Sequence, residues 1–217
     1  MEQGALTTGF FLIALDEPAG RPALHPELLA CGLVGAQLAD LVVAGALTVT
    51  EDERVHATRS AAPQATTDEA AALVLDSVVH EPRAHPVRAW VDALGAPLTE
   101  LVQIDLVRRG VLAVEERRGL LGRRHTRLAV TDPPAAHAPE TTLRSMVRHP
   151  STFTLHGAST LVLVAALGVE QLLEPEIDRA TARDRAGQAT AHLPGAIARL
   201  RDGLAAAATA VGVAVRR

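Results

Sequence analysis

The chain has no lysine and no tyrosine, and its aromatic residues are three phenylalanines and one tryptophan among 217 residues. With so few rings, the sequence offers almost nothing on which nucleic-acid bases could stack. The formal net charge of −4 also argues against nonspecific binding of nucleic acid by the surface as a whole. No nucleic-acid partner is therefore expected, and only a local basic patch could serve one.

Cysteine occurs once, as Cys31, so no disulfide can form within the chain. A lone cysteine among apolar neighbours indicates a reducing compartment and predicts a small buried side chain. The N-terminal residues lack the basic segment, the long apolar segment and the cleavage site of a secretory signal. These absences predict a cytoplasmic location.

Motifs of common catalytic and metal sites are also missing. The sequence contains no P-loop, no G-x-G-x-x-G and no G-x-S-x-G. Of the nine histidines, His80 and His85 come nearest to a zinc-protease motif, but the second is one position late and Pro82 interrupts the required helix. No catalytic residue, no metal site and no cofactor is predicted.

The longest apolar run covers residues 28–47, and its only plainly polar side chains are Gln37 and Asp40. At helical rise this run would span roughly 30 Å, the thickness of a bilayer's hydrocarbon region. A membrane helix would carry the ionisable Asp40 near its middle and would lack flanking aromatic and basic anchors. A start at Pro26 and a stop at Gly45 are typical of a helix in a soluble domain. We expect a central, fully buried helix.

The remaining sequence predicts a mainly α fold, a single globular domain over residues 1–217 with helices packed around the central buried apolar helix and with short β-hairpins. Residues 9–15 are apolar and compatible with either a strand or a first helical turn. Turns or loops are expected at 95–97 and 132–140. Hairpins are expected at 46–58 and 111–131, and helices at 68–80, 86–94, 98–109, 141–149, 158–173, 175–192 and 195–215.

A short internal similarity links the two hairpins. Residues 41–49, LVVAGALTV, and residues 106–114, LVRRGVLAV, align without gaps and share Leu, Val, Gly, Leu and Val. Each segment is predicted to be a helix that ends at glycine and leads into a hairpin. Similar local geometry is a sufficient explanation for so short a match.

Positive charge is concentrated at the tip of the second hairpin. Between Val107 and Arg127 there are seven arginines and two glutamates, a local net charge of +5 in a chain of net charge −4. Leu120 and Leu121 lie between two pairs of arginines. The candidate lipid-binding residues are Arg117, Arg118, Arg123, Arg124 and Arg127.

A basic tip with apolar residues favours contact with an anionic lipid surface, because arginine binds phosphate bidentately and leucine enters the apolar boundary. Leu120 and Leu121 are therefore candidates for membrane insertion or for contact between copies in a homo-oligomer. A simple solvated hairpin is the third interpretation, and the residues alone leave all three open.

Five segments in this order resemble the Golgi phosphoprotein 3 family, in its actinobacterial branch, over about residues 6–204. They are FFLIALDEPAGR, ADLVVAGALTV, DEAAALVLDSVVHEPRAHPVRAWVDAL, LVRRGVLAVEERRGLLGRRHTRLAVTDP and the apolar helix after HPSTFTLHGAS. The resemblance implies a largely helical domain with hairpins and a non-enzymatic, peripheral membrane protein. Eukaryotic members bind phosphatidylinositol 4-phosphate, insert the hydrophobic hairpin into the bilayer and bind cytosolic segments of membrane proteins.

The eukaryotic head-group residues, one aromatic and three arginines, fall here at His25, Val34, Ala96 and Thr99. None of these is arginine, and only His25 could carry a positive charge. The hypothesis is a cytoplasmic adaptor, peripheral to the membrane, that docks on anionic phospholipid through its basic hairpin. The alternatives are a purely protein-interaction module and a winged-helix-like DNA-binding module, the latter opposed by Glu100 and Asp105 on the would-be recognition helix.

Overall fold

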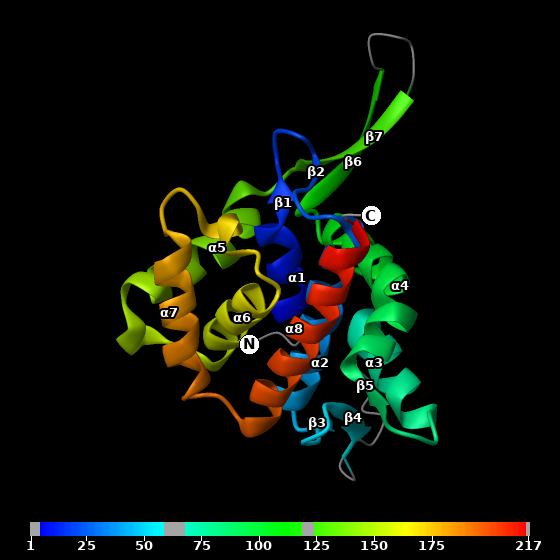
Figure 1. Ribbon diagram of the computed structural model, residues 1–217. Helices are drawn as coiled ribbons and strands as arrows, with labels where there is room; N and C mark the ends of the chain where they lie inside the picture. The colour runs from blue at the N-terminus through cyan, green and yellow to red at the C-terminus, as the bar shows by residue number, and fades with distance from the viewer. Residues whose placement is uncertain (1–4, 59–67, 119–123, 216–217) are drawn as a thin grey trace.

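The computed structural model describes residues 5–58, 68–118 and 124–215 (Figure 1). Most of these residues are helical, as the sequence predicts. The helices are α1 (Ala5–Ile13), α2 (Pro26–Val43), α3 (Glu69–His80), α4 (Val87–Arg108), α5 (Pro133–Arg148), α6 (Leu155–Ala166), α7 (Arg179–Thr190) and α8 (Gly195–Val215), with short 3₁₀ turns at Pro150–Thr152 and Glu170–Leu173.

Three small antiparallel sheets accompany the helices. Strands β1 (Leu15–Asp16) and β2 (Arg21–Pro22) form one hairpin, and β6 (Leu112–Arg118) and β7 (Arg124–Val130) form another. The third sheet has the order β3 (Leu47–Val49), β4 (Arg54–Ala57) and β5 (His85–Pro86). Both hairpins expected from the sequence are confirmed: β3 and β4 form the one at residues 46–58, and β6 and β7 form the one at residues 111–131. Strand β5 pairs with β4 and so adds a third strand to the first of these hairpins.

Helix α2 is the centre of the fold. Every residue from Cys31 to Val42 is buried, so all sides of this part of the helix face protein. Helices α1, α4, α6 and α8 pack around it. Among the described residues, α2 is the one helix long and apolar enough to cross a bilayer, but 67% of it is buried inside the fold. This burial is what the interpretation as a central helix predicts.

Two glycines let neighbouring helices approach α2 closely. A Cβ atom on Gly32 would lie 2.1 Å from Cε1 of Phe10 in α1, and one on Gly35 would lie 2.5 Å from Cδ1 of Leu204 in α8. Both distances are far shorter than van der Waals contact. The absence of a side chain at these two positions therefore sets the spacing of α1 and α8 from the central helix.

The sequence left residues 9–15 open between a strand and a helical turn, and most of them belong to helix α1. Two segments expected to connect helices were predicted wrongly. The loop expected at 132–140 is the first half of α5, whose N-cap residue Asp132 accepts a hydrogen bond from the backbone N–H of Ala135. The turn expected at 95–97 does not exist, because α4 continues through Pro97 as one helix.

Candidate functional site

The β6–β7 hairpin projects from the helical body (Figure 1). Its base is attached to the body, since Leu112 and Leu128 are buried. The backbone N–H of Leu128 also donates a 2.8 Å hydrogen bond to the carbonyl oxygen of Gly20, in the turn between β1 and β2. Gly20 has a positive φ of 66°, and a Cβ there would lie 2.7 Å from Cβ of Arg127. The β1–β2 hairpin therefore braces β7 through close backbone contact.

Arg127, one of the five candidate arginines, belongs to the base of this hairpin. It faces Glu115 across the two strands, and its Nη2 lies 2.8 Å from the Glu115 Oε2. The Arg127 side chain is 24% exposed. The charge of Arg127 is thus balanced within the hairpin, and its position is set by cross-strand pairing.

The other candidate arginines lie toward the tip. The strand register places Arg118 opposite Arg124 and Arg117 opposite His125. For these positions the structure describes the backbone register only. Leu120, Leu121 and Arg123 lie outside the described residues. The register therefore brings three of the candidate arginines, Arg117, Arg118 and Arg124, to the distal half of the hairpin.

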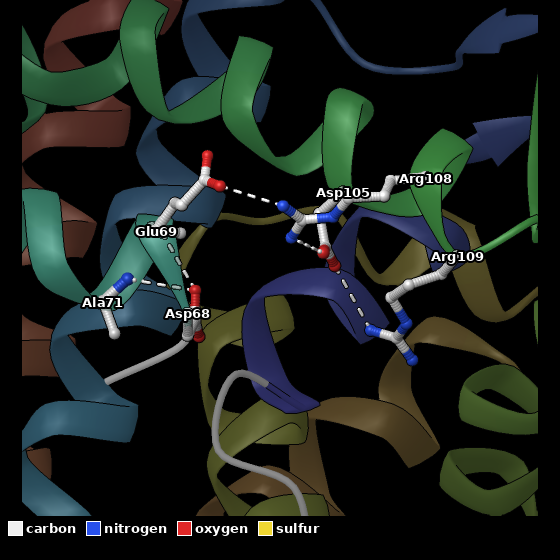
Figure 2. A network of polar contacts seen from close by, with 7 residues as sticks. Asp68, Glu69, Ala71, Asp105, Arg108 and Arg109 are labelled. Carbon is white, nitrogen blue, oxygen red and sulfur yellow. Dashed lines mark hydrogen bonds and ion pairs between the residues drawn. The ribbon is translucent and has the colours of Figure 1, made fainter. Parts of the chain in front are cut away.

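Two further arginines that raise the local charge in the sequence are held by the body of the protein (Figure 2). Arg108, at the end of α4, donates hydrogen bonds to Glu69 of α3 at 2.9 Å and to Asp105 at 2.7 Å, and these bonds raise its pKa. Arg109 donates to the other oxygen of Asp105 at 3.3 Å. Asp68 caps the start of α3 in the same region. Arg108 therefore joins α3 to α4, Arg109 pairs with a residue of α4, and neither extends the basic surface of the hairpin.

A cleft of about 890 Å³ opens between the first turns of α2, one face of α4 and the end of α8. Its apolar lining includes Leu24, Leu29, Val91 and Val211. Its charged lining consists of two arginines and three carboxylates: Arg21, Arg88, Glu27, Asp92 and Glu100. The cleft is therefore apolar inside and slightly acidic in total.

The electrostatic effect of these carboxylates reaches the helix beneath them. Burial, followed by the negative charges of Asp92 and Glu27, raises the pKa of the Cys31 thiol to about 11, while Arg88 opposes the shift. Cys31 is completely buried in α2. At the Cys31 thiol, therefore, the charges of Asp92 and Glu27 add to the effect of burial.

A second polar group is buried at the junction of α1, α2 and α6. Burial raises the pKa of Asp40 to about 7, although the backbone N–H groups of Leu6 and Thr7 oppose the shift. The Thr7 hydroxyl donates a 3.0 Å hydrogen bond to Gln37, and His156 Nε2 lies 3.7 Å from Asp40 Oδ1. The sequence marked Asp40 and Gln37 as polar residues of a core helix, but it gave no signal for their partners on α1 and α6.

Three polar atoms at this junction and nearby have no hydrogen-bond partner among the described residues. They are Asp40 Oδ2, Gln37 Nε2 and Ser159 Oγ, and all three side chains are almost fully buried. Unpaired buried polar atoms each cost about 1–3 kcal/mol. This part of the core is therefore less stable than its apolar surroundings.

The family model of Golgi phosphoprotein 3 (GPP34) matches residues 6–215, nearly the whole chain. The chain belongs to the Golgi phosphoprotein 3 family. A search of the curated proteins found no match. The match extends beyond residue 204, the end of the segment that the sequence motifs indicate, and includes the whole of α8 that the structure describes.

Three of the four positions that the resemblance assigns to the head group lie in or directly beside the acidic cleft. Ala96 and Thr99 line it, and the exposed His25 directly precedes α2, between the lining residues Leu24 and Pro26. Val34 is completely buried and does not line the cleft. At the positions that the resemblance assigns to the three eukaryotic arginines, this chain has the uncharged side chains of Val34, Ala96 and Thr99.

Possible metal ligands are dispersed over residues 5–58, 68–118 and 124–215. No group of three or more His, Cys, Asp or Glu side chains there is placed to hold a metal ion. The contacts of His80 with Asp76 at 3.0 Å and of His85 with Glu81 at 3.2 Å each join exposed side chains four positions apart.

Proposed function

We propose that this Golgi phosphoprotein 3 family member is a non-enzymatic, peripheral membrane protein whose β6–β7 hairpin contacts an anionic lipid surface. The observation that carries the proposal is the pairing of Arg118 with Arg124 at the far end of a projecting hairpin. Like charges directly opposite each other destabilise a sheet. Anionic lipid head groups between such arginines would remove this repulsion and would form charge-assisted hydrogen bonds.

The two leucines at the tip support the same orientation. Leu120 and Leu121 follow the strand end in the sequence and are flanked by arginines on both sides. Apolar residues between basic ones suit the boundary between head groups and acyl chains. Contact through this tip would leave the helical body in the cytoplasm.

The family also suggests an adaptor role, with cytosolic segments of membrane proteins as partners. In this proposal the hairpin supplies the membrane contact and the helical body supplies surface for such partners. Assembly of copies through the hairpin is the competing use of the same leucines. DNA binding is not favoured, because Arg108 and Arg109 at the end of the would-be recognition helix are paired with Asp105 and Glu69.

Vesicle flotation tests the lipid contact. We expect the chain to float with vesicles of phosphatidylcholine and phosphatidylglycerol at low salt, and to bind less at high salt because the attraction is screened. Replacing Arg117, Arg118, Arg123 and Arg124 by Gln should weaken binding by at least about tenfold, since each basic residue near an anionic surface contributes roughly 1 kcal/mol. Leu120→Ser with Leu121→Ser should weaken the binding that remains at high salt.

A matched control has the same change in net charge elsewhere on the surface. Replacing Arg83, Arg148, Arg185 and Arg201 by Gln removes four positive charges outside the hairpin and should leave most of the binding intact. The proposal fails if the unmodified chain does not bind anionic vesicles at low salt, or if both quadruple variants bind equally. Light scattering of each variant in solution tests the competing assembly of copies.

A further inference from the structure

The charged groups of the cleft divide into a paired set and an unpaired set. Arg88 and Asp92 form an ion pair, with the Arg88 Nε 3.8 Å from the Asp92 Oδ2. Arg21, Glu27 and Glu100 have no hydrogen-bond or ion-pair partner for their side chains within the described ranges. The cleft therefore presents one guanidinium group and two carboxylates to whatever occupies it.

These groups surround an apolar lining of suitable size. Clefts that bind small ligands commonly have volumes of ~300–1,000 Å³, and this cleft has about 890 Å³. Leu24, Leu29, Val91 and Val211 offer apolar surface to the part of a ligand that carries no charge. A ligand that satisfies the whole cleft needs an anionic group, a cationic group and an apolar stem.

We propose that this cleft binds the head group of a zwitterionic phospholipid that carries a primary ammonium, as in an ethanolamine phospholipid. The Arg21 guanidinium would bind the phosphate, for which its planar donors are suited. The ammonium would donate its hydrogen atoms to the carboxylates of Glu27 and Glu100. The glycerol and the first acyl carbons would lie against the apolar lining.

The same charges argue against the polyanionic head group that the eukaryotic family members bind. Three carboxylates line the cleft against two arginines, and Asp92 already engages one of these arginines. Burial is the largest cause of the raised pKa of the Cys31 thiol beneath the cleft, and the negative charges of Asp92 and Glu27 add to it. An additional phosphate on an inositol ring would be repelled by these groups.

A choline head group distinguishes hydrogen bonding from simple charge attraction. Its nitrogen carries three methyl groups and no hydrogen, so it cannot donate to Glu27 or Glu100. If the carboxylates accept hydrogen bonds from the ligand, the cleft must prefer ethanolamine over choline. The loss of charge-assisted hydrogen bonds of this kind lowers affinity by roughly 10- to 150-fold.

Calorimetric titration of the full chain with short-chain lipids, kept below their micelle concentration, tests the cleft without a bilayer. We expect dihexanoyl phosphatidylethanolamine to bind at least about tenfold more tightly than the matching phosphatidylcholine or phosphatidylinositol 4-phosphate. Glu100→Gln and Arg21→Gln should each weaken ethanolamine lipid binding by about fivefold. The expected effect is this small because both side chains are exposed and solvent screens their charges. Glu51→Gln, the same change on the exposed turn between β3 and β4, should leave affinity unchanged.

This inference rests on the proposed function, since a bilayer would present the lipid, but the two fail separately. The hairpin variant should still bind short-chain ethanolamine lipid, and Glu100→Gln should still float with anionic vesicles. Equal affinity for ethanolamine and choline lipids, preference for the inositol lipid, no binding of any lipid, or normal affinity of a well-folded Glu100→Gln variant would each overturn the cleft assignment.

Discussion

The hydroxyl of Thr131 donates a 2.7 Å hydrogen bond to the carbonyl oxygen of Gly110. Thr58 makes the same bond to Gly45, also at 2.7 Å. Both glycines follow the ends of long helices, α4 and α2, and both threonines follow the second strand of the next hairpin. In each case, therefore, a threonine from the returning strand ties the hairpin to the glycine that ends the helix.

The backbone around the two glycines is also the same. Gly45 has φ of 73° and Gly110 has φ of 71°. The backbone N–H of the residue after each glycine donates to the carbonyl oxygen five positions earlier, Ala46 to Leu41 at 2.9 Å and Val111 to Leu106 at 3.0 Å. The glycines donate a second hydrogen bond, Gly45 to Val42 and Gly110 to Val107, both at 3.0 Å. A helix end with both hydrogen bonds requires a residue with left-handed backbone geometry after the helix. The similarity of residues 41–49 and 106–114 thus corresponds to a shared local structure.

Gly110→Ala should destabilise the fold by about 1 kcal/mol, because a side chain at positive φ is strained. No atom lies within 4 Å of the Cβ that the substitution would add, so the cost should come from the backbone alone. Urea denaturation gives the free energy of unfolding. The control is Gly187→Ala, in helix α7 with equally open space, which should stabilise by ~0.5–1 kcal/mol. Similar effects of the two substitutions would refute the assignment.

Gly32→Ala should cost about 1–3 kcal/mol for a different reason, which is overpacking. Its Cβ would lie 2.1 Å from the fully buried ring of Phe10. In the double variant Gly32→Ala with Phe10→Leu, the smaller side chain makes room for the methyl group. The double variant should therefore be more stable than the sum of the single effects predicts. Strict additivity in urea denaturation would show that the two residues do not compete for space.

The predictable and unpredictable parts of this fold differ in the range of the interactions that determine them. The apolar run of α2 and the glycine at its end are local signals, and they identified the central helix and the following hairpin. Pro97 is also a local signal, but it led to the wrong prediction of a turn, because α4 continues through it. In this part of α4, Gly95 packs closely against Ala30 of α2. Prolines similarly concealed the first half of α5, although proline is well tolerated in a first helical turn.

The candidate sites show the same division. The basic hairpin could be found from the sequence because its arginines are neighbours along the chain. The cleft could not, since its lining residues come from β2, α2, α4 and α8, which are far apart in the sequence. The sequence also overstated the charge of the hairpin region, because Arg108 pairs with Glu69, 39 positions earlier.

Arg127→Gln should affect the hairpin's stability more than its lipid binding. Arg127 is paired with Glu115 across the strands at the base of the hairpin. We expect amide exchange in β6 and β7 to become faster, because a cross-strand ion pair contributes about 0.2–1 kcal/mol. Vesicle flotation should change by less than about twofold, a smaller effect than Arg124→Gln produces. If Arg127→Gln reduces flotation as strongly as Arg124→Gln, Arg127 contacts lipid directly.

Asp40→Asn should make the protein less sensitive to pH. The pKa of Asp40 is raised from an ordinary value of 3.8 to about 7 by burial, so the folded chain holds this proton more tightly than the unfolded chain. The stabilisation from the neutral carboxyl is complete below pH ~4 and is lost as pH rises through 7. Between pH 5 and pH 8 the unmodified chain should lose on the order of 2 kcal/mol that the Asn variant retains.

Urea denaturation at several pH values from 5 to 8 measures this difference. His156→Gln serves as one control, because His156 is the titratable group from α6 that faces Asp40 at 3.7 Å. Its replacement removes the contact with Asp40 but keeps the Asp40 carboxyl, so the loss of stability between pH 5 and pH 8 should remain. Asp184→Asn, a change in the exposed part of α7, should run parallel to the unmodified chain at every pH. If Asp40→Asn also runs parallel, the Asp40 carboxyl does not retain its proton near neutral pH.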